Sequence, residues 1–340
     1  METRYRGHAT GLAAAALDGE FGLVLTLGGD GTVNEAVNGI LGPAPPARYA
    51  VPEITVPEIT VPEITVPETT VPETTVPETT GAVGHTARAG HAGEVNPGGL
   101  PGARLAARAG ATGSLPAFAP LPGGNANVFT RALGLPADPV DAAGRILQAL
   151  AEGRSRHVGL GLAGDRYFTF NAGLGLDAEV VRAVDGRRAE GRTATPALYV
   201  RMALHQFYRV TDRRHPALTL ERAGHAPDGP VFVSIVSNTA PWSFLGRRPI
   251  NPNPEASFDS GLDVFALRTL RSVGTVRAIG HTLTRTERPP GGRNVLTEHD
   301  LAEVTIRSNR PVAFQVDGEY MGERECVRFL SVPDALRVVA

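Results

Sequence analysis

The sequence contains no lysine, since all 33 of its lysine and arginine residues are arginine. This absence excludes the lysines with which P-loop proteins and protein kinases contact nucleotide phosphates. A nucleotide-binding protein of this composition must hold the phosphates in another way. The lysine-free, arginine-, alanine- and glycine-rich usage is also typical of a genome with GC-rich codons.

Cysteine and long apolar runs are scarce as well. Cys326 is the only cysteine, which excludes an intramolecular disulfide and a cysteine-based metal site and is typical of a reducing compartment. No apolar run approaches membrane-spanning length, and no secretory signal is visible. The formal net charge of -2 over 340 residues gives no electrostatic reason to expect a nucleic acid partner. We expect a cytoplasmic, globular protein of two domains. The sequence does not indicate its oligomeric state.

Residues 51–80 are a tandem array of five-residue units, VPEIT three times and then VPETT three times. Repeated X-Pro pairs favour extended or polyproline II backbone, and one glutamate per unit makes the array repel itself. The Gly/Ala-rich stretch that follows shows no periodicity. We therefore predict one long disordered insertion over 43–115.

The rest of the sequence changes character near residue 155. Before this point, two apolar runs each lead through a glycine turn into a helical pattern, and a further helix follows Asp138, with Pro139 first and Ile146, Leu147 and Leu150 on one face. After it, short strand-like runs dominate, with one convincing helix at 194–209. We predict an α/β domain over 1–155, a β-sandwich domain over 156–330, and a strand at 331–340 that could pack back on the first domain.

The stretch LTLGGDGTVNEAVNGI at 25–40 combines a strand, a glycine turn and a helix start. Its glycines would let a phosphate approach the unpaired N–H groups and the positive dipole end of the helix. Asp30, in the same turn, is better suited to hold Mg²⁺ or to order its waters. A tight turn without a ligand is the alternative, and Thr32 with Glu35 also fits a capping box.

A second candidate is DGE at 317–319, directly after the strand-like run VAFQV. Phosphoryl transfer to an alcohol needs positioning, charge neutralisation and a carboxylate that accepts the hydroxyl proton, and such base help is typically worth about 10²–10⁴-fold. A turn at the end of this strand would expose Asp317 and Glu319. Asp-Gly is also common in surface hairpin turns, and spacing alone favours that interpretation.

Five motifs, taken in order, resemble those of the diacylglycerol kinase catalytic-domain family, the bacterial lipid kinases related to sphingosine kinases. They are GGDGTVNEAVNGI, PLPGGNANVFTRALGLP, FNAGLGLDAEVV, SIVSN and QVDGE, and they cover nearly the whole chain outside the insertion. GGDG alone is shared with NAD kinases and phosphofructokinases, whereas the five together are specific. The resemblance implies an ATP-binding α/β domain and a β-sandwich lipid-substrate domain, with ATP in the cleft between them.

The resemblance also implies roles for individual residues. Glu319 would accept the proton of the lipid hydroxyl, Asp30 would organise Mg²⁺, and Asp177 would lie close to the lipid headgroup. The residues expected to bind the nucleotide are Thr3, Gly28, Gly29, Asp30, Gly31, Thr32, Asn34, Gly124, Asn125 and Asn127.

The sequence departs from the family pattern in three places. The strand, helix and strand that the family carries before Thr3 are missing, so we expect either an upstream start or an incomplete nucleotide site. Val128 stands where the family has an aspartate. In NPEASFDSGLDVF the usual metal-ligating aspartate falls on Ser260, so a structural Mg²⁺ in this loop would have to be held by Ser257, Asp259 and Leu262.

Two aromatic-bearing stretches could meet a lipid. In APWSFLG at 240–246, Trp242 and Phe244 could sit at a bilayer interface, and core packing is the open alternative. In the predicted helix at 194–209, Leu198, Met202, His205 and Tyr208 recur at helical spacing, and core packing is their favoured role.

We therefore expect an ATP-dependent lipid kinase, cytoplasmic and peripheral at the inner membrane face, that phosphorylates the hydroxyl of diacylglycerol or a similar lipid. One alternative is a non-catalytic or decayed lipid- or nucleotide-binding homologue. An NAD kinase is a further alternative, less favoured because the second glycine turn resembles the lipid kinases. The sequence leaves the acceptor lipid and the role of the repeat array open.

Overall fold

The computed structural model describes residues 1–43, 115–189, 201–202, 205–206, 212–246, 248–270, 273–284 and 288–340. Almost all of the predicted insertion, and most of the helix predicted at 194–209, lie outside these residues. From that helix, Met202 is described, and it is buried against Val184.

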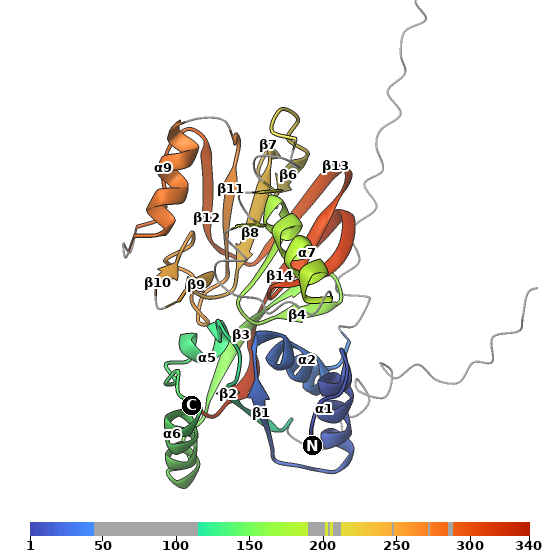
Figure 1. Ribbon diagram of the computed structural model, residues 1–340, viewed down its shortest axis with the longest axis vertical. Helices are drawn as coiled ribbons and strands as arrows, with labels where there is room; N and C mark the ends of the chain where they lie inside the picture. Colours follow the sequence, from blue (N-terminus) through green and yellow to red (C-terminus); the bar gives the residue numbers. More distant parts are fainter. Residues whose placement is uncertain are drawn as a thin grey trace, which may run out of the picture.

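The N-terminal region is an α/β unit, in the lower part of Figure 1. Its strands β1 (Leu23–Gly28) and β2 (Ala117–Pro122) pair in parallel, so that Gly28 lies opposite Pro122. Because the carboxyl ends of parallel strands meet at one edge of a sheet, both glycine turns begin side by side. The helices of this region are α1 (His8–Asp18), α2 (Asp30–Leu41), α5 (Val128–Ala132) and α6 (Pro139–Ala151).

Helix α6 begins as the sequence predicts. The Asp138 carboxylate accepts the N–H groups of Val140 and Asp141, and Pro139 lies in the first turn, where its missing N–H costs no hydrogen bond. The predicted apolar face is wrong in part, because Ile146 is buried whereas Leu147 and Leu150 are exposed.

The C-terminal region is rich in β-structure. Its strands are β3 (Arg156–Ala163), β4 (Arg166–Phe168), β5 (Asn171–Gly175), β6 (Leu218–Glu221), β7 (Asp228–Val231), β8 (Val233–Ser237), β11 (Leu262–Leu267), β12 (Val295–Leu301), β13 (Glu303–Val316) and β14 (Glu319–Val338). Together with β1 and β2 they form one continuous hydrogen-bonded path, β1-β2-β14-β13-β5-β8-β11-β12, with β3, β4, β6 and β7 attached beside it. Strands β9 (Ser243–Leu245) and β10 (Arg248–Ile250) form a separate hairpin.

Strand β14 joins the two regions. It pairs with β13 from Glu319 opposite Val316 onward, and near its end Val338 lies beside Phe118 of β2. The positions 331–338, predicted as part of a separate strand, are the last part of β14. Strand β14 therefore starts at the DGE turn and ends beside β2, in the N-terminal region that the sequence predicts to bind the nucleotide.

The prediction of a single helix after residue 156 is wrong. Helix α7 (Leu176–Ala189) follows directly on β5, and α9 (Val273–Thr282) follows β11. The start of α7 depends on Gly175, whose φ of 83° favours glycine and whose Cβ, if present, would lie 2.4 Å from the carbonyl oxygen of Phe232. Ala178, Val181 and Val184 form a buried face at three-residue spacing, a helical signal that short strand-like runs obscured.

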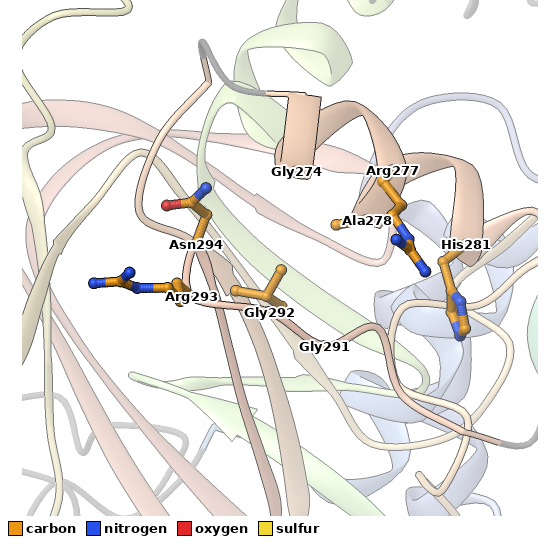
Figure 2. Close-up of a pocket in the computed structure, with 9 residues that line it drawn as sticks. Gly274, Arg277, Ala278, His281, Gly291, Gly292, Arg293 and Asn294 are labelled. Carbon is orange, nitrogen blue, oxygen red and sulfur yellow. The ribbon is translucent and has the colours of Figure 1, made fainter.

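Two large hydrophobic clusters fill the regions. One lies around Phe118, Phe129 and Ile40 and includes Val338 of β14, and the other lies around Phe168 and Phe329. Beside α9, a cavity of about 460 Å³ opens against the segment 291–295 (Figure 2). Among the described residues, no helix combines the length and hydrophobicity needed to cross a bilayer.

Candidate active site

The two glycine turns lie directly against each other. The Gly123 N–H donates to the Gly28 carbonyl at 2.8 Å. A Cβ on Gly124 would lie 2.5 Å from Cα of Gly29, and a Cβ on Gly123 would lie 2.9 Å from the nitrogen of Gly28. Because main chain touches main chain here, a side chain at Gly123 or Gly124 would force the two turns apart.

The first turn of α2 presents its N–H groups at this junction. Gly29 is the N-cap and has no side-chain hydrogen bond, and the N–H of Val33 is bonded to the Gly29 carbonyl at 3.1 Å. The N–H groups before Val33 have no carbonyl one turn earlier in the helix to bond, and together with the helix dipole they favour an anion. Gly28, Gly29 and Gly31 thus border a helix start that can accept phosphate.

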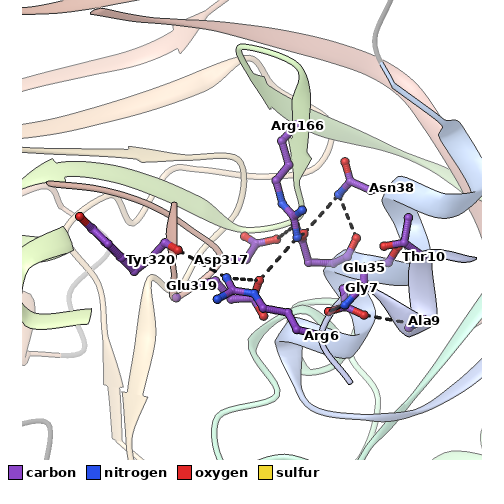
Figure 3. Close-up of polar contacts among 12 residues, drawn as sticks. Arg6, Gly7, Ala9, Thr10, Glu35, Asn38, Arg166, Asp317, Glu319 and Tyr320 are labelled. Atoms are coloured by element: carbon purple, nitrogen blue, oxygen red, sulfur yellow. Dashed lines mark hydrogen bonds and ion pairs between the residues drawn. The ribbon is translucent and has the colours of Figure 1, made fainter. Parts of the chain in front are cut away.

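Glu35 does not complete a capping box with Thr32, so that interpretation is wrong. Helix α2 begins at Asp30, which places Thr32 inside the first turn instead of at the cap. The Glu35 carboxylate instead accepts the N–H groups of Gly7 at 2.6 Å and Ala9 at 3.1 Å, at the start of α1 (Figure 3). Glu35 therefore fixes α1 on α2 and positions Arg6, the residue before Gly7.

The carboxylate of Asp30 lies between the two turns. Its Oδ1 accepts the N–H of Phe129 at 3.2 Å, which ties α2 to α5. Burial, with a smaller contribution from the charge of Asp317, raises the pKa of Asp30 to about 7, while the main-chain donor at Phe129 opposes this rise. A bound divalent cation would offset this cost, and a carboxylate oxygen is a ligand that Mg²⁺ prefers, so Asp30 fits the role of an Mg²⁺ ligand.

Glu319 reaches the first glycine turn from the start of β14. A Cβ on Gly31 would lie 2.6 Å from Oε1 of Glu319. The other oxygen, Oε2, pairs with Nη2 of Arg6 at 3.2 Å and with Nη2 of Arg166 at 3.5 Å. Figure 3 shows both arginines converging on this carboxylate from α1's leading segment and from β4. The structure therefore brings a carboxylate, two guanidinium groups and an anion-binding helix start together.

Asp317 is buried, so the expectation that the turn exposes both carboxylates is wrong. Asp317 and Gly318 have φ values of 46° and 75°, as in a tight two-residue hairpin turn between β13 and β14. The Asp317 carboxylate accepts the N–H groups of Thr169, Phe170 and Asn171, the Thr169 hydroxyl and the Asn34 amide, at 2.7–3.1 Å. Burial raises its pKa against these donors. Asp317 thus anchors the turn, and Glu319 alone faces the site.

Asn34, predicted to bind the nucleotide, lies buried beneath the site. Its amide nitrogen donates to Oδ2 of Asp317 at 2.7 Å and to the carbonyl of Tyr167 at 2.9 Å. Its Oδ1 accepts Nη2 of Arg166 at 2.6 Å. Because these contacts occupy the side chain, Asn34 holds α2 and Arg166 in place and is not free to contact a phosphate.

The other predicted nucleotide residues are placed in different ways. Asn127 has a left-handed backbone, with φ 48°, and its amide makes two hydrogen bonds with the main chain of Gly124, so it shapes the second turn. Asn125 and Thr3 are exposed, and Val128 is buried in the core. Asn125 lies on the exposed side of the turn, where a ligand can reach it.

Asp177 lies in the first turn of α7 and is joined to the DGE turn. Its Oδ2 accepts Nε2 of Gln315 at 2.8 Å, and Oε1 of Gln315 accepts the Gly318 N–H at 2.9 Å. Nε2 of Gln315 also donates to Oδ1 of Asn171 at 2.8 Å. Burial raises the pKa of Asp177 to about 6, against the opposing hydrogen bond from Gln315.

The predicted metal loop forms hydrogen bonds within itself, and its role as a cation site stays a prediction. The Ser260 hydroxyl donates to the carbonyl of Ser257 at 3.1 Å, and Asp259 is exposed, with its N–H bonded to the Ser257 hydroxyl. Leu262 is paired in β11. In the described part of the chain, no three His, Cys, Asp or Glu side chains are grouped closely enough to hold a metal ion.

In the APWSFLG stretch, Ser243–Leu245 form strand β9, and Trp242 lies in a bend just before it. Trp242 is partly buried against the apolar cluster around Phe265, and its carbonyl accepts Nδ2 of Asn171 at 3.0 Å. The guanidinium of Arg131 lies 4.2 Å from the ring centre of Phe244. Both aromatic rings therefore have protein contacts.

Sequence reasoning missed Arg6, Arg166 and Gln315. Arg166 opens the run RYFTFNAG, which reads as a strand, and Gln315 belongs to the quoted QVDGE motif. The absence of lysine was the one available signal, since arginine alone can supply fixed positive charge beside phosphates in this chain.

The site joins two glycine turns at the start of a helix to a facing carboxylate, and comparisons with known proteins find relatives of this fold. A model described as the diacylglycerol kinase catalytic domain matches residues 1–61, which include the first glycine turn, and confirms the resemblance. A crystal structure from Bacillus anthracis str. Sterne, provisionally named a diacylglycerol kinase, matches with a TM-score of 0.61 and 16% identity, over 100% of this chain and 84% of that chain.

A further structure from the same organism, named a diacylglycerol kinase, has a TM-score of 0.57 and 14% identity, over 100% of this chain and 83% of that chain. At these identities the likeness establishes a shared fold. A search of curated proteins finds no significant match.

Proposed function

We propose that the protein is an ATP-dependent lipid kinase that transfers the γ-phosphoryl group to the hydroxyl of diacylglycerol or a similar lipid. The observation that carries this proposal is the approach of Glu319 to Gly31 at the start of α2. A carboxylate that can accept the hydroxyl proton and a helix start that can hold phosphate are two of the parts that phosphoryl transfer to an alcohol requires. The match to a kinase domain supports the same class of reaction.

In this proposal the ATP phosphates lie over the double glycine turn. Main-chain N–H groups of the first turn of α2 hold the phosphate oxygens, and glycine lets the phosphates approach without a Cβ in the way. Asn125 and Thr3, both exposed, remain candidates for contacts to the rest of the nucleotide. Asp30 would hold Mg²⁺, which neutralises the charge of the phosphates when bound.

Glu319 is the proposed proton acceptor. The lipid hydroxyl oxygen forms a bond to the γ-phosphorus, the bond from that phosphorus to the leaving ADP oxygen breaks, and the hydroxyl proton passes to the Glu319 carboxylate. The ion pairs of Glu319 with Arg6 and Arg166 hold this carboxylate beside Gly31 before the substrates arrive.

The two arginines would then take the phosphates as partners. Guanidinium groups form paired, charge-assisted hydrogen bonds with phosphate oxygens, which are stronger than neutral ones. Arg166 is already oriented by Oδ1 of Asn34, and its Nε is buried without a hydrogen-bond partner. An incoming phosphate would pair with Nη2 of Arg166 in place of Glu319 and so free one carboxylate oxygen of Glu319.

Asp177 would orient the lipid headgroup. Its carboxylate is fixed by Gln315, which also contacts the Asn171 amide and the Gly318 N–H of the DGE turn. The same glutamine therefore couples the proposed headgroup residue to the turn that carries Glu319. In this proposal the protein works in the cytoplasm, peripherally at the inner membrane face, where such a lipid is found.

The test is transfer of labelled γ-phosphate from ATP by the purified protein, with diacylglycerol in mixed micelles or NAD as acceptor. We expect labelled lipid and no labelled dinucleotide. Glu319→Gln is expected to lower turnover by about 10²–10⁴-fold, the typical worth of a general base. Glu323→Gln is the matched control, because Glu323 lies on the same strand and forms an exposed ion pair with Arg182 at 3.0 Å.

Transfer of the labelled phosphate to NAD would contradict the proposal and support the NAD kinase alternative. Binding of ATP without transfer to either acceptor would support the non-catalytic alternative. An active Glu319→Gln variant would overturn the assignment of the base.

A further inference from the structure

In helix α9 the large apolar residues face away from the protein, whereas a helix that packs on a sheet normally buries them. Its buried positions are the small or polar residues Thr275, Ala278 and Thr282. Its large apolar residues face outward, with Val273 86%, Val276 68% and Ile279 41% exposed. Because these three recur every three residues, they form one continuous stripe along the helix.

Positive charge adjoins this stripe. Arg277 lies between Val276 and Ile279 in the sequence and is exposed. The cavity beside α9 is lined by Arg277, His281 and Arg293, and the described residues around it include no aspartate or glutamate. Figure 2 shows Arg277 and His281 projecting side by side from α9, opposite the segment 291–294. An apolar stripe flanked by arginine is the pattern of a helix that lies in a membrane interface.

A series of contacts connects this helix to the candidate site. The N–H of Asn251, just after β10, donates to the carbonyl of Thr282 at the end of α9, at 2.8 Å. The β9–β10 hairpin begins after Trp242, whose carbonyl accepts the amide of Asn171. Asn171 contacts Gln315, which contacts Asp177. Figure 1 shows α9 on the outer edge of the C-terminal region, above this hairpin.

We propose that α9 is a membrane-docking surface, made of Val273, Val276 and Ile279 with Arg277, His281 and Arg293, that binds an anionic phospholipid bilayer. The apolar stripe enters the interface, and the arginines meet the lipid phosphates. This inference rests on the proposed function, since a kinase whose acceptor is dissolved in a bilayer must bind that bilayer. Docking through α9 would hold the Asp177 side of the site near the acceptor.

Charge complementarity favours a bilayer over a second copy of the chain as the occupant. In a symmetric contact between two α9 stripes, the surface with Arg277 and Arg293 would meet another positive surface, which is unfavourable. An anionic bilayer offers both an apolar interior for the stripe and negative charge for the arginines.

The test is co-sedimentation of the full chain with vesicles, without nucleotide, so that the result does not depend on catalysis. Vesicles of phosphatidylglycerol and phosphatidylcholine are compared with vesicles of phosphatidylcholine alone. We expect the protein to prefer the anionic vesicles and added salt to weaken the binding. The double variant Val276→Glu and Ile279→Glu should bind them more than about tenfold more weakly, and Arg277→Gln about fivefold more weakly, the factor expected for one arginine near an anionic surface.

The matched control is Val140→Glu with Leu147→Glu on α6, where the two apolar side chains are 77% and 66% exposed. It should leave vesicle binding unchanged. Equal binding by the α9 variant, an equal loss in the α6 variant, or no binding by the unmodified protein would overturn the proposal. So would loss of self-association in the α9 variant, by analytical ultracentrifugation, with vesicle binding unchanged.

Failure of the proposed function is recognised separately. Phosphorylation of a short-chain, water-soluble diacylglycerol needs no bilayer, and the α9 variant should keep this activity. Loss of vesicle binding with this activity intact supports the docking role, whereas an unmodified protein that docks but phosphorylates no diacylglycerol refutes only the kinase.

Discussion

At the scale of single residues, the site depends on which partners each charged side chain has. Glu319 has two arginines at one oxygen and the glycine turn at the other, whereas Asp317, two residues earlier, is enclosed by five donors. These two carboxylates, only two residues apart, therefore have different roles. Asp317 fixes the turn, and Glu319 faces the first glycine turn, where the proposed function places the reactants.

Arg166→Gln tests the phosphate role of an arginine that the sequence did not single out. A charge-assisted hydrogen bond to phosphate is worth about 1.5–3 kcal/mol, so we expect KM for ATP to rise by about tenfold or more. Arg182→Gln is the control, since Arg182 pairs with Glu323 in an exposed position. Steady-state kinetics checks both, and an unchanged KM for ATP in Arg166→Gln would remove the arginine from the nucleotide site.

Asp177→Asn tests a titrating carboxylate. Folding raises the pKa of Asp177 from 3.8 to about 6, so the folded state binds more protons than the unfolded state between these values. Its contribution to stability is therefore present below pH 4, falls as the pH rises to about 6, and stays low above that. The asparagine avoids this loss, so the variant should be more stable at pH 8 by up to about 3 kcal/mol.

Urea unfolding at pH 4 and pH 8 measures the effect of Asp177→Asn. If Asp177 also orients the lipid, the same variant will lose activity while gaining stability, as is common for functional residues. If Asp177→Asn and the unmodified protein differed in stability by the same amount at both pH values, the pKa of Asp177 would not be raised as described.

At the scale of secondary-structure elements, the junction of β1, β2, α2 and α5 forms the proposed nucleotide-binding surface. The elements meet through glycine, so their spacing is set by main-chain contact and tolerates little change. Gly124→Ala would place a Cβ 2.5 Å from Cα of Gly29.

We expect Gly124→Ala to lower the free energy of unfolding by about 1–3 kcal/mol, as overpacking does. The control is Gly144→Ala within α6, where a Cβ would meet no atom within 4 Å and alanine should stabilise the helix by about 0.5–1 kcal/mol. Opposite signs for the two variants in chemical denaturation support the tight junction, and a neutral Gly124→Ala would contradict it.

The elements whose signals are local could be predicted from the sequence. The glycine turn before α2 and the Asp138-Pro139 start of α6 are examples, because capping and turn chemistry act over a few residues. The burial of Asp317 could not be predicted, since its donors lie near residue 170 and in α2. The outward stripe of α9 also reverses the usual pattern, in which periodic apolar residues mark the buried face.

At the scale of the whole molecule, β14 and the buried Asp317 join the two regions. Val338 lies beside β2, and Asn34 of α2 bonds Asp317 of the C-terminal region. Because these links cross from one region to the other, we expect the regions to unfold together.

Equilibrium unfolding checks this cooperativity with two probes. Trp242 is the only tryptophan and reports on the C-terminal region by fluorescence, while circular dichroism also reports on α1, α2 and α6. We predict one coincident transition, and two separated midpoints would show that the regions are energetically independent.

The central claim is that a lysine-free chain binds ATP through the main-chain amides of its paired glycine turns. The most direct measurement is calorimetric titration of ATP with Mg²⁺ into the protein, into Gly124→Ala and into Gly144→Ala. We predict saturable binding at one site, weakened in Gly124→Ala and unchanged in Gly144→Ala. Absence of binding heat for the unmodified protein, or equal affinity in all three, would contradict it.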